Sequence, residues 1–146
     1  EVDEVIKAAM ERPARTVIIT GGEPLIYNLD VLCRKLHQNG FTIHLETSGA
    51  YPMSGEVDWV CLSPKKTAPP LKEVLEKANE LKVIVHNNDD LKWAESFVEK
   101  VSESTKLYLQ PEWGKQETVM PVVIEYVMTN VNWNISLQTH KYMRIP

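Results

Sequence analysis

The residues best suited to chemistry follow a β-branched run of strand length. Thr16 to Thr20 read Thr-Val-Ile-Ile-Thr, and Gly21-Gly22-Glu23-Pro24-Leu25 comes directly after them. Because glycine has no side chain, a ligand can approach the backbone N–H and C=O groups there within hydrogen-bond distance. The Glu23 carboxylate could accept charge-assisted hydrogen bonds from a ligand ammonium group. A plain surface turn that carries Glu23 is the alternative interpretation, and the motif alone does not decide between the two.

Polar side chains also stand where each predicted strand ends. They are Thr20, Glu46, Ser63, His86, Gln110 and Gln138. In parallel sheets and α/β barrels the carboxyl ends of the strands meet at one rim, where ligands bind. Each residue taken singly could instead satisfy backbone groups of a loop. Together they predict a pocket that recognises amides, amines and hydroxyls.

Strands and helices alternate along the whole chain. The predicted strands span residues 16–20, 41–46, 57–62, 81–86, 106–110 and 133–138, and the predicted helices span residues 2–12, 29–39, 71–79, about 90–104 and 117–130. We expect Asn28 and Gly40 to flank the second helix, Asp89 and Asp90 to cap the fourth, and Pro121 to lie in the first turn of the fifth. This order predicts an α/β fold with a mostly parallel sheet and helices outside it, in a single domain over residues 1–146.

The composition narrows the class of protein. Of the 146 residues, 43% are hydrophobic and 25% are charged, as in globular domains. The net charge of −4 argues against non-specific binding to nucleic acid. No apolar run approaches the roughly 20 residues that cross a bilayer, and the first residues do not form a signal peptide, so we expect a cytoplasmic protein without membrane partners. Cys33 and Cys61 are expected to be buried thiols, and they are too few for a zinc or iron–sulfur site of their own.

Five segments carry a resemblance to a known family. They are Thr20 to Leu25, Glu46-Thr-Ser-Gly49, Leu62-Ser-Pro-Lys65, Leu109-Gln-Pro-Glu112 and Ser136-Leu-Gln-Thr-His-Lys-Tyr142. In this order they resemble the radical S-adenosylmethionine enzymes and, among these, the 7-carboxy-7-deazaguanine synthase family. The resemblance implies a partial, open radical-SAM-type β/α barrel. The family begins with a strand and a three-cysteine loop that binds a [4Fe–4S] cluster beside a magnesium-ligating Thr. Nothing before Thr16 resembles that part, so we expect an N-terminally truncated domain that is inactive alone and supplies no metal ligand.

The resemblance also implies the residues of the site. The positions that match the cofactor-binding positions for S-adenosylmethionine, with their neighbours, are Gly21, Gly22, Glu23, Glu46, Ser48, Ser63, Pro64, Lys65, Gln110, Pro111, Glu112 and Trp113. The substrate positions are Thr20 and Pro146, with Gln138 and His140 as candidates close by. We expect the free α-carboxylate of Pro146 to accept hydrogen bonds from the guanidine-like edge of a pterin. A solvated Lys65, a structural His140 and a frayed tail are the alternatives.

The activity implied by the resemblance is a radical ring contraction in queuosine and deazapurine biosynthesis. A reduced cluster would cleave S-adenosylmethionine to a 5′-deoxyadenosyl radical, which would abstract hydrogen from 6-carboxy-5,6,7,8-tetrahydropterin. Loss of ammonia, assisted by magnesium, would give 7-carboxy-7-deazaguanine, and the enzyme would be a lyase and a homodimer. Two alternatives stay open: another radical enzyme such as a glycyl-radical-enzyme activase, and a cluster-less domain that binds a nucleoside or pterin.

Overall fold

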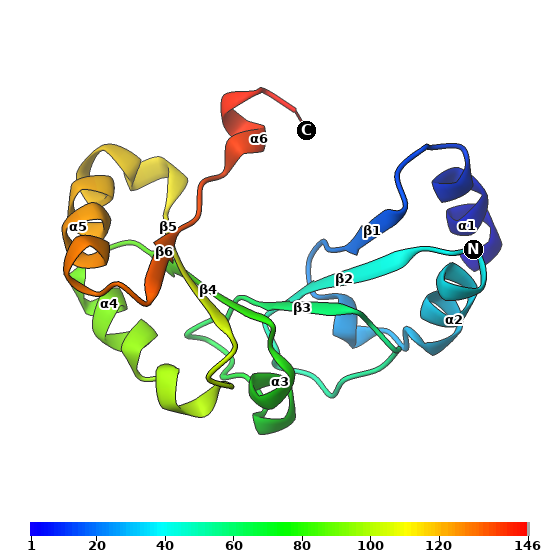
Figure 1. Cartoon of the computed structure of the whole chain (residues 1–146), viewed down its shortest axis with the longest axis horizontal. Helices are drawn as coiled ribbons and strands as arrows, with labels where there is room; N and C mark the ends of the chain where they lie inside the picture. The colour runs from blue at the N-terminus through cyan, green and yellow to red at the C-terminus, as the bar shows by residue number, and fades with distance from the viewer. Residues whose placement is uncertain (146) are drawn as a thin grey trace. The chain divides into compact units, whose positions relative to one another are not determined.

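The computed structural model of the chain describes residues 1–145. It forms two compact units, an N-terminal unit of residues 1–79 and a C-terminal unit that begins at residue 80. Each unit contains three strands that run parallel, with helices packed on them (Figure 1). No helix within residues 1–145 combines the length and the apolar character that a membrane crossing requires. Whether the two units form the single domain expected from the sequence stays a prediction.

The N-terminal unit is a three-stranded layer covered by short helices. Its strands lie in the order β1 (Thr16–Ile19), β2 (Thr42–Thr47) and β3 (Trp59–Leu62), and its helices are α1 (Val2–Met10), η1 (Pro24–Ile26), α2 (Asp30–Gln38) and α3 (Lys72–Lys77). Ile43 and Leu45 of β2 are fully buried in one core with Leu36 of α2. Because successive residues of a strand point to opposite faces, His44 and Glu46 lie on the other face of the layer.

The C-terminal unit repeats this arrangement. Its strands are β4 (Glu80–Val85), β5 (Lys106–Pro111) and β6 (Trp133–Ile135), and its helices are α4 (Asn88–Glu95), η2 (Val98–Lys100), η3 (Trp113–Lys115), α5 (Gln116–Thr129) and α6 (Thr139–Tyr142). Leu81, Val83 and Val85 alternate with half-buried residues and are fully buried, as are Ala94 of α4 and Val123 of α5. This alternation gives the strands one apolar face for the helices.

Every predicted strand is present, with ends that shift by no more than three residues, and the expected Gly40 follows α2 with a φ of 77°. The cap of α4 differs from the expectation. Asn87, rather than Asp89 or Asp90, is the N-cap, and its side chain accepts a hydrogen bond from the N–H of Asp89 at 2.9 Å. Asp90 completes a capping box by accepting from the N–H of Asn87 at 3.2 Å. The two aspartates therefore lie inside the first turn of the helix.

The start of α2, the end of α4 and the C-terminal segment also differ from the sequence-based expectation. Leu29, not Asn28, is the N-cap of α2, although the Asn28 side chain accepts from the N–H of Asp30 at 2.8 Å. The helix after Asn87 ends at Glu95, where the Ser96 hydroxyl donates to the carbonyl of Trp93 and competes with helix continuation.

The helix α5 begins one residue earlier than expected, at Gln116, so Pro121 lies in its second turn. There its nitrogen cannot donate to the carbonyl of Glu117. Residues 139–142, expected as part of the tail after the sixth strand, form α6, and β6 ends at Ile135 rather than at Gln138.

Candidate functional site

The Gly-Gly-Glu turn of the N-terminal unit is closed by its glutamate. Glu23 is the N-cap of η1, and its Oε1 accepts hydrogen bonds from the N–H of Leu25 at 3.1 Å and from the hydroxyl of Thr47 at 2.6 Å. Its Oε2 accepts from the N–H of Ser48 at 2.8 Å and from the Ser48 hydroxyl. Four donors thus converge on one carboxylate. Glu23 therefore joins the turn after β1 to the end of β2.

The same four contacts set the charge state of Glu23. Burial by itself raises the pKa of this carboxyl group, but the hydrogen bonds from Ser48, Thr47 and Leu25 together outweigh it, and the pKa lies below its ordinary value of 4.5. Glu23 is therefore ionised near neutral pH. Its negative charge stands beside the two glycines, where a ligand ammonium group would be attracted.

Thr47 is the residue of this network that the sequence-based prediction missed. Its side chain is 4% exposed, and its hydroxyl donates to Glu23 while it accepts from the N–H of Gly49 at 3.0 Å. The signal was present in the strand pattern, because Thr47 follows Ile43 and Leu45 on the buried face. A polar side chain at such a position needs hydrogen-bond partners.

The two glycines of the turn differ in what they allow. Gly21 has a φ of 114°, which side-chain-bearing residues rarely adopt, so the turn itself requires glycine there. Gly22 has no such constraint, and a Cβ built on it would meet no atom within 4 Å. The space beside Gly22 is therefore open to a ligand, and the backbone there is accessible.

The end of β3 adjoins this turn through β2. The N–H of Ser63 donates to the carbonyl of Thr47 at 2.7 Å, and Pro64 behind it is buried. Lys65 is exposed and forms an isolated bridge with Ala68. The structure thus brings three groups of predicted residues to the ends of adjacent strands: Thr20 to Glu23, Glu46 with Ser48, and Ser63 with Pro64. The solvated position of Lys65 agrees with the alternative considered for it.

In the C-terminal unit the predicted residues gather around the end of β5. The Gln110 side chain is buried, and its Oε1 accepts from the hydroxyl of Ser136 at 3.1 Å, which ties β5 to the residue after β6. Pro111 is buried as well. The N–H groups of Gly114 and Lys115, in that order, hold the pKa of Glu112 below its ordinary value, with smaller contributions from nearby positive charge. The Glu112 carboxylate therefore lies over the turn that follows it.

Trp113, Gln138 and His140 occupy the surface next to this turn. The Trp113 ring is 37% exposed and meets the Tyr142 ring edge-on, with the ring centroids 5.0 Å apart. Gln138 is the N-cap residue of α6, and the exposed His140 accepts a hydrogen bond at its backbone carbonyl from the N–H of Ile145 at 2.9 Å. Pro146, with its predicted carboxylate contact, lies outside the described residues.

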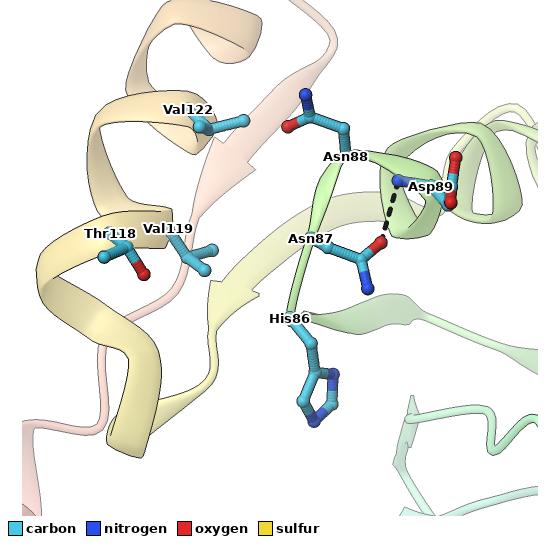
Figure 2. A pocket seen from close by; sticks show the side chains of 7 residues that line it. All are labelled: His86, Asn87, Asn88, Asp89, Thr118, Val119 and Val122. Atoms are coloured by element: carbon cyan, nitrogen blue, oxygen red, sulfur yellow. Dashed lines mark hydrogen bonds between the residues drawn. The ribbon is translucent and has the colours of Figure 1, made fainter.

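Within the C-terminal unit, a cavity of about 410 Å³ opens between α5 and the segment that connects β4 to α4 and begins α4. Figure 2 shows Val119 and Val122 of α5 facing the connection from β4 to α4, which supplies His86 and Asn87. Buried Asp90 accepts from the N–H of His86 at 2.7 Å, and its carboxylate lies 3.5 Å from His86 Nδ1. This contact supports a structural role for His86, whose side chain remains half exposed.

The described residues do not fit an iron–sulfur cluster. Cys33 and Cys61 are buried thiols, as expected, and they belong to α2 and β3. Burial raises the pKa of the Cys33 thiol, which opposes the thiolate form that a cluster needs. Among residues 1–145 no group of three or more His, Cys, Asp or Glu side chains could hold a metal ion.

Comparison with known proteins places the chain among enzymes of one kind. It is 47% identical over 143 residues to the 7-carboxy-7-deazaguanine synthase of Flavobacterium psychrophilum, with 98% of this chain and 68% of that protein covered. It is 44% identical over 144 residues to the synthase of the same name from a Synechocystis species, with 99% and 69% covered. No protein-family model matches the chain.

A solved structure confirms the predicted fold class. The crystal structure of QueE from Escherichia coli superposes with a TM-score of 0.83 at 30% identity, over 94% of this chain and 64% of that one. The molecule is thus an α/β enzyme chain whose parallel strands end in polar, ligand-accessible turns. As its sequence motifs predict, the chain belongs to the 7-carboxy-7-deazaguanine synthase family.

Proposed function

We propose that this protein converts 6-carboxy-5,6,7,8-tetrahydropterin to 7-carboxy-7-deazaguanine, with loss of ammonia and with S-adenosylmethionine as cofactor. The chain spans about two thirds of the length of the relatives it matches. The observation that carries the proposal is the turn from Gly21 to Glu23, which leaves glycine backbone accessible beside an ionised, hydrogen-bonded carboxylate. The amino-acid end of S-adenosylmethionine offers the ammonium group that such a turn would attract.

The contacts of Glu23 refine its role in this proposal. Each carboxylate oxygen already accepts two hydrogen bonds, which is close to the capacity of its lone pairs. The ammonium group would therefore find its direct acceptors among the backbone carbonyls at Gly21 and Gly22. Glu23 would fix the shape of the turn and contribute negative potential. When bound and reductively cleaved, S-adenosylmethionine supplies a carbon radical that abstracts hydrogen from the substrate.

The other predicted residues would bind and orient the two molecules. For the cofactor these are Glu46, Ser48, Ser63, Pro64 and Lys65 in the N-terminal unit, and Gln110, Pro111, Glu112 and Trp113 in the C-terminal unit. For the pterin they are Thr20, Gln138, His140 and Pro146. Hydroxyl, amide and imidazole groups can pair with the hydrogen-bonding edges of a pterin, and their task is orientation and exclusion of water. No side chain is assigned a covalent step.

The remaining parts of the proposal come from the family. A [4Fe–4S] cluster and a magnesium ion belong to it, but residues 1–145 offer no ligand set for either, and no step is derived through them. Homodimer formation, a cytoplasmic location and the absence of nucleic-acid partners are proposed on the same footing. By itself, this chain is proposed to bind ligands without turnover.

Binding of S-adenosylmethionine, measured by isothermal titration calorimetry, tests the proposal with a pair of variants. Gly22→Ala adds a methyl group where the structure has open space, so folding should be unchanged while the cofactor Kd rises about tenfold or more. Met128→Ala, at an exposed residue of α5 outside the proposed site, is the control and should leave the Kd unchanged. An equal Kd for Gly22→Ala and wild type would refute cofactor binding at this turn.

Turnover is tested in a chimaera. The relative from Flavobacterium psychrophilum supplies the third of its length that the match does not cover. After reconstitution with iron and sulfide, release of 5′-deoxyadenosine and of 7-carboxy-7-deazaguanine is followed by liquid chromatography. A chimaera that binds its cluster and cofactor but forms no deazaguanine from the pterin would contradict the proposed substrate.

A further inference from the structure

Side-chain contacts hold the short helix α6 against the turn that follows β5. The Tyr142 ring meets the Trp113 ring at 80°, with the centroids 5.0 Å apart, and the Tyr142 hydroxyl accepts a hydrogen bond from the Gln116 side chain. Lys141 Nζ lies 5.2 Å from the centroid of the Trp113 ring. A ring and a cation of α6 thus both contact the tryptophan ring. The sequence analysis placed Trp113 only among the cofactor positions and their neighbours.

The far end of α6 is closed by the backbone. Arg144 has a φ of 55°, its N–H donates to the carbonyl of Lys141 at 3.2 Å, and the N–H of Ile145 donates to the carbonyl of His140 at 2.9 Å. This pair of bonds around a left-handed residue is the Schellman arrangement that ends helices. Residues 139–145 therefore form a closed local structure, unlike the frayed tail considered from the sequence.

A helix of four residues cannot sustain itself in water, because the nucleation cost of a helix exceeds the gain from its few hydrogen bonds. Contacts outside α6 must supply the difference. The side-chain contacts given above all come from the turn after β5 and from the first residue of α5. Gln138, at the start of α6, and His140, within it, are consequently placed by the Trp113–Tyr142 ring pair.

We propose that Trp113 and Tyr142 are positioning residues that hold α6 in the geometry in which Gln138 and His140 bind the pterin. The identity of this ligand rests on the proposed function. The ring pair also joins the segment proposed for the cofactor, Gln110 to Trp113, to the segment proposed for the substrate. Because the two rings are in contact, displacement of one moves the other. A substitution at Tyr142 therefore changes the position of the substrate segment without altering any group that touches substrate.

Hydrogen exchange and ligand binding, measured on the chain itself, test this role. Tyr142→Ala removes the ring pair and the hydroxyl, Tyr142→Phe keeps the ring, and Met128→Ala removes an exposed side chain of α5 as the control. The amides of Lys141, Met143, Arg144 and Ile145 report on α6, because each donates a hydrogen bond within it or at its end. The second measurement is the Kd of anaerobic 6-carboxy-5,6,7,8-tetrahydropterin by calorimetry.

An aromatic pair of this kind corresponds to about a tenfold change in an equilibrium once its buried area is included. In Tyr142→Ala we expect these amides to exchange about tenfold faster and the pterin Kd to rise about tenfold. Tyr142→Phe should recover most of both effects, and Met128→Ala should show neither.

Two results would overturn the proposal. Equal exchange in Tyr142→Ala and wild type would mean that the rings do not hold α6, and faster exchange with an unchanged pterin Kd would mean that α6 does not position the substrate groups. A wild-type chain that binds no pterin would instead refute the proposed ligand, and with it the substrate part of this inference. The exchange rates would still decide whether the ring pair holds the helix.

Discussion

The two units of the molecule place a glutamate at the same local position in different surroundings. In each, a glutamate follows closely after the carboxyl end of a strand and is the N-cap of a 3-10 turn: Glu23 before η1 and Glu112 before η3. Both carboxyl groups have pKa values below the ordinary one. Glu23 is reached by Thr47 and Ser48 from the neighbouring strand, whereas Glu112 lies over the N–H groups of its own turn.

Because of this difference, the two rims are stabilised by different interactions. The rim of the N-terminal unit is held by ionic hydrogen bonds between two strand ends, and it should be rigid while Glu23 is ionised. The rim of the C-terminal unit is held by the ring pair and by a cation over a ring, which do not need the Glu112 charge. A glutamate at this position links two strands only where the neighbouring strand has hydrogen-bond donors that reach its carboxylate.

The largest effect is expected at the Glu23 carboxylate. Glu23→Ala leaves the Thr47 hydroxyl and the Ser48 N–H without their acceptor, which should lower the free energy of unfolding by about 1.5–3 kcal/mol. Thr47→Val keeps the side-chain shape and removes one of the four donors, so about 1 kcal/mol is expected. Urea unfolding followed by circular dichroism measures both. If Glu23→Ala and Glu112→Ala lowered the free energy of unfolding by equally small amounts, the contrast between the two rims would be contradicted.

A smaller and graded effect is expected on acidification. Because the folded-state pKa of Glu23 lies below its ordinary value of 4.5, its contribution to stability is present above about pH 4.5 and is lost as the pH falls through the folded-state pKa. Asp58 acts in the same direction below its ordinary 3.8, because hydrogen bonds with His37 and with the N–H of Ile43 lower its pKa.

Glu23→Gln should therefore flatten the decline of unfolding free energy between pH 5 and pH 3. Glu112→Gln is the matched control in the other unit and should change this slope less, because its carboxylate is exposed. Identical slopes for the two variants would show that the links to β2 do not distinguish Glu23.

The smallest effect is expected at the cation over Trp113. Lys141→Met keeps the aliphatic stem and removes the charge, so the loss should be about 0.5–1 kcal/mol. Amide exchange of Met143 and Ile145 would then quicken by about twofold to fivefold, less than in Tyr142→Ala. An effect as large as that of Tyr142→Ala would mean that charge, and not the ring pair, holds α6.

The sequence determined the elements and the family of this protein. Every strand was located from its pattern of apolar residues. Burial of one face imposes a characteristic period on a strand or a helix, regardless of which elements pack against it. The motif from Gly21 to Glu23 was also recognisable for a local reason. The φ of 114° at Gly21 restricts which residue type can stand at that position. The buried thiols of Cys33 and Cys61 were also read correctly from their apolar surroundings.

The contacts of the site residues, in contrast, followed from the tertiary structure alone. Glu23 was expected to receive a ligand, and three of its four donors, one from Thr47 and two from Ser48, depend on the pairing of β1 with β2. Thr47 escaped notice because its partner is 24 positions away in the chain. The helix α6 is too short to have a periodic pattern, and its ring contact joins Tyr142 to Trp113, which is distant in the chain. Local sequence limits which backbone a residue can adopt, whereas hydrogen bonds and ring contacts between distant segments are fixed by packing.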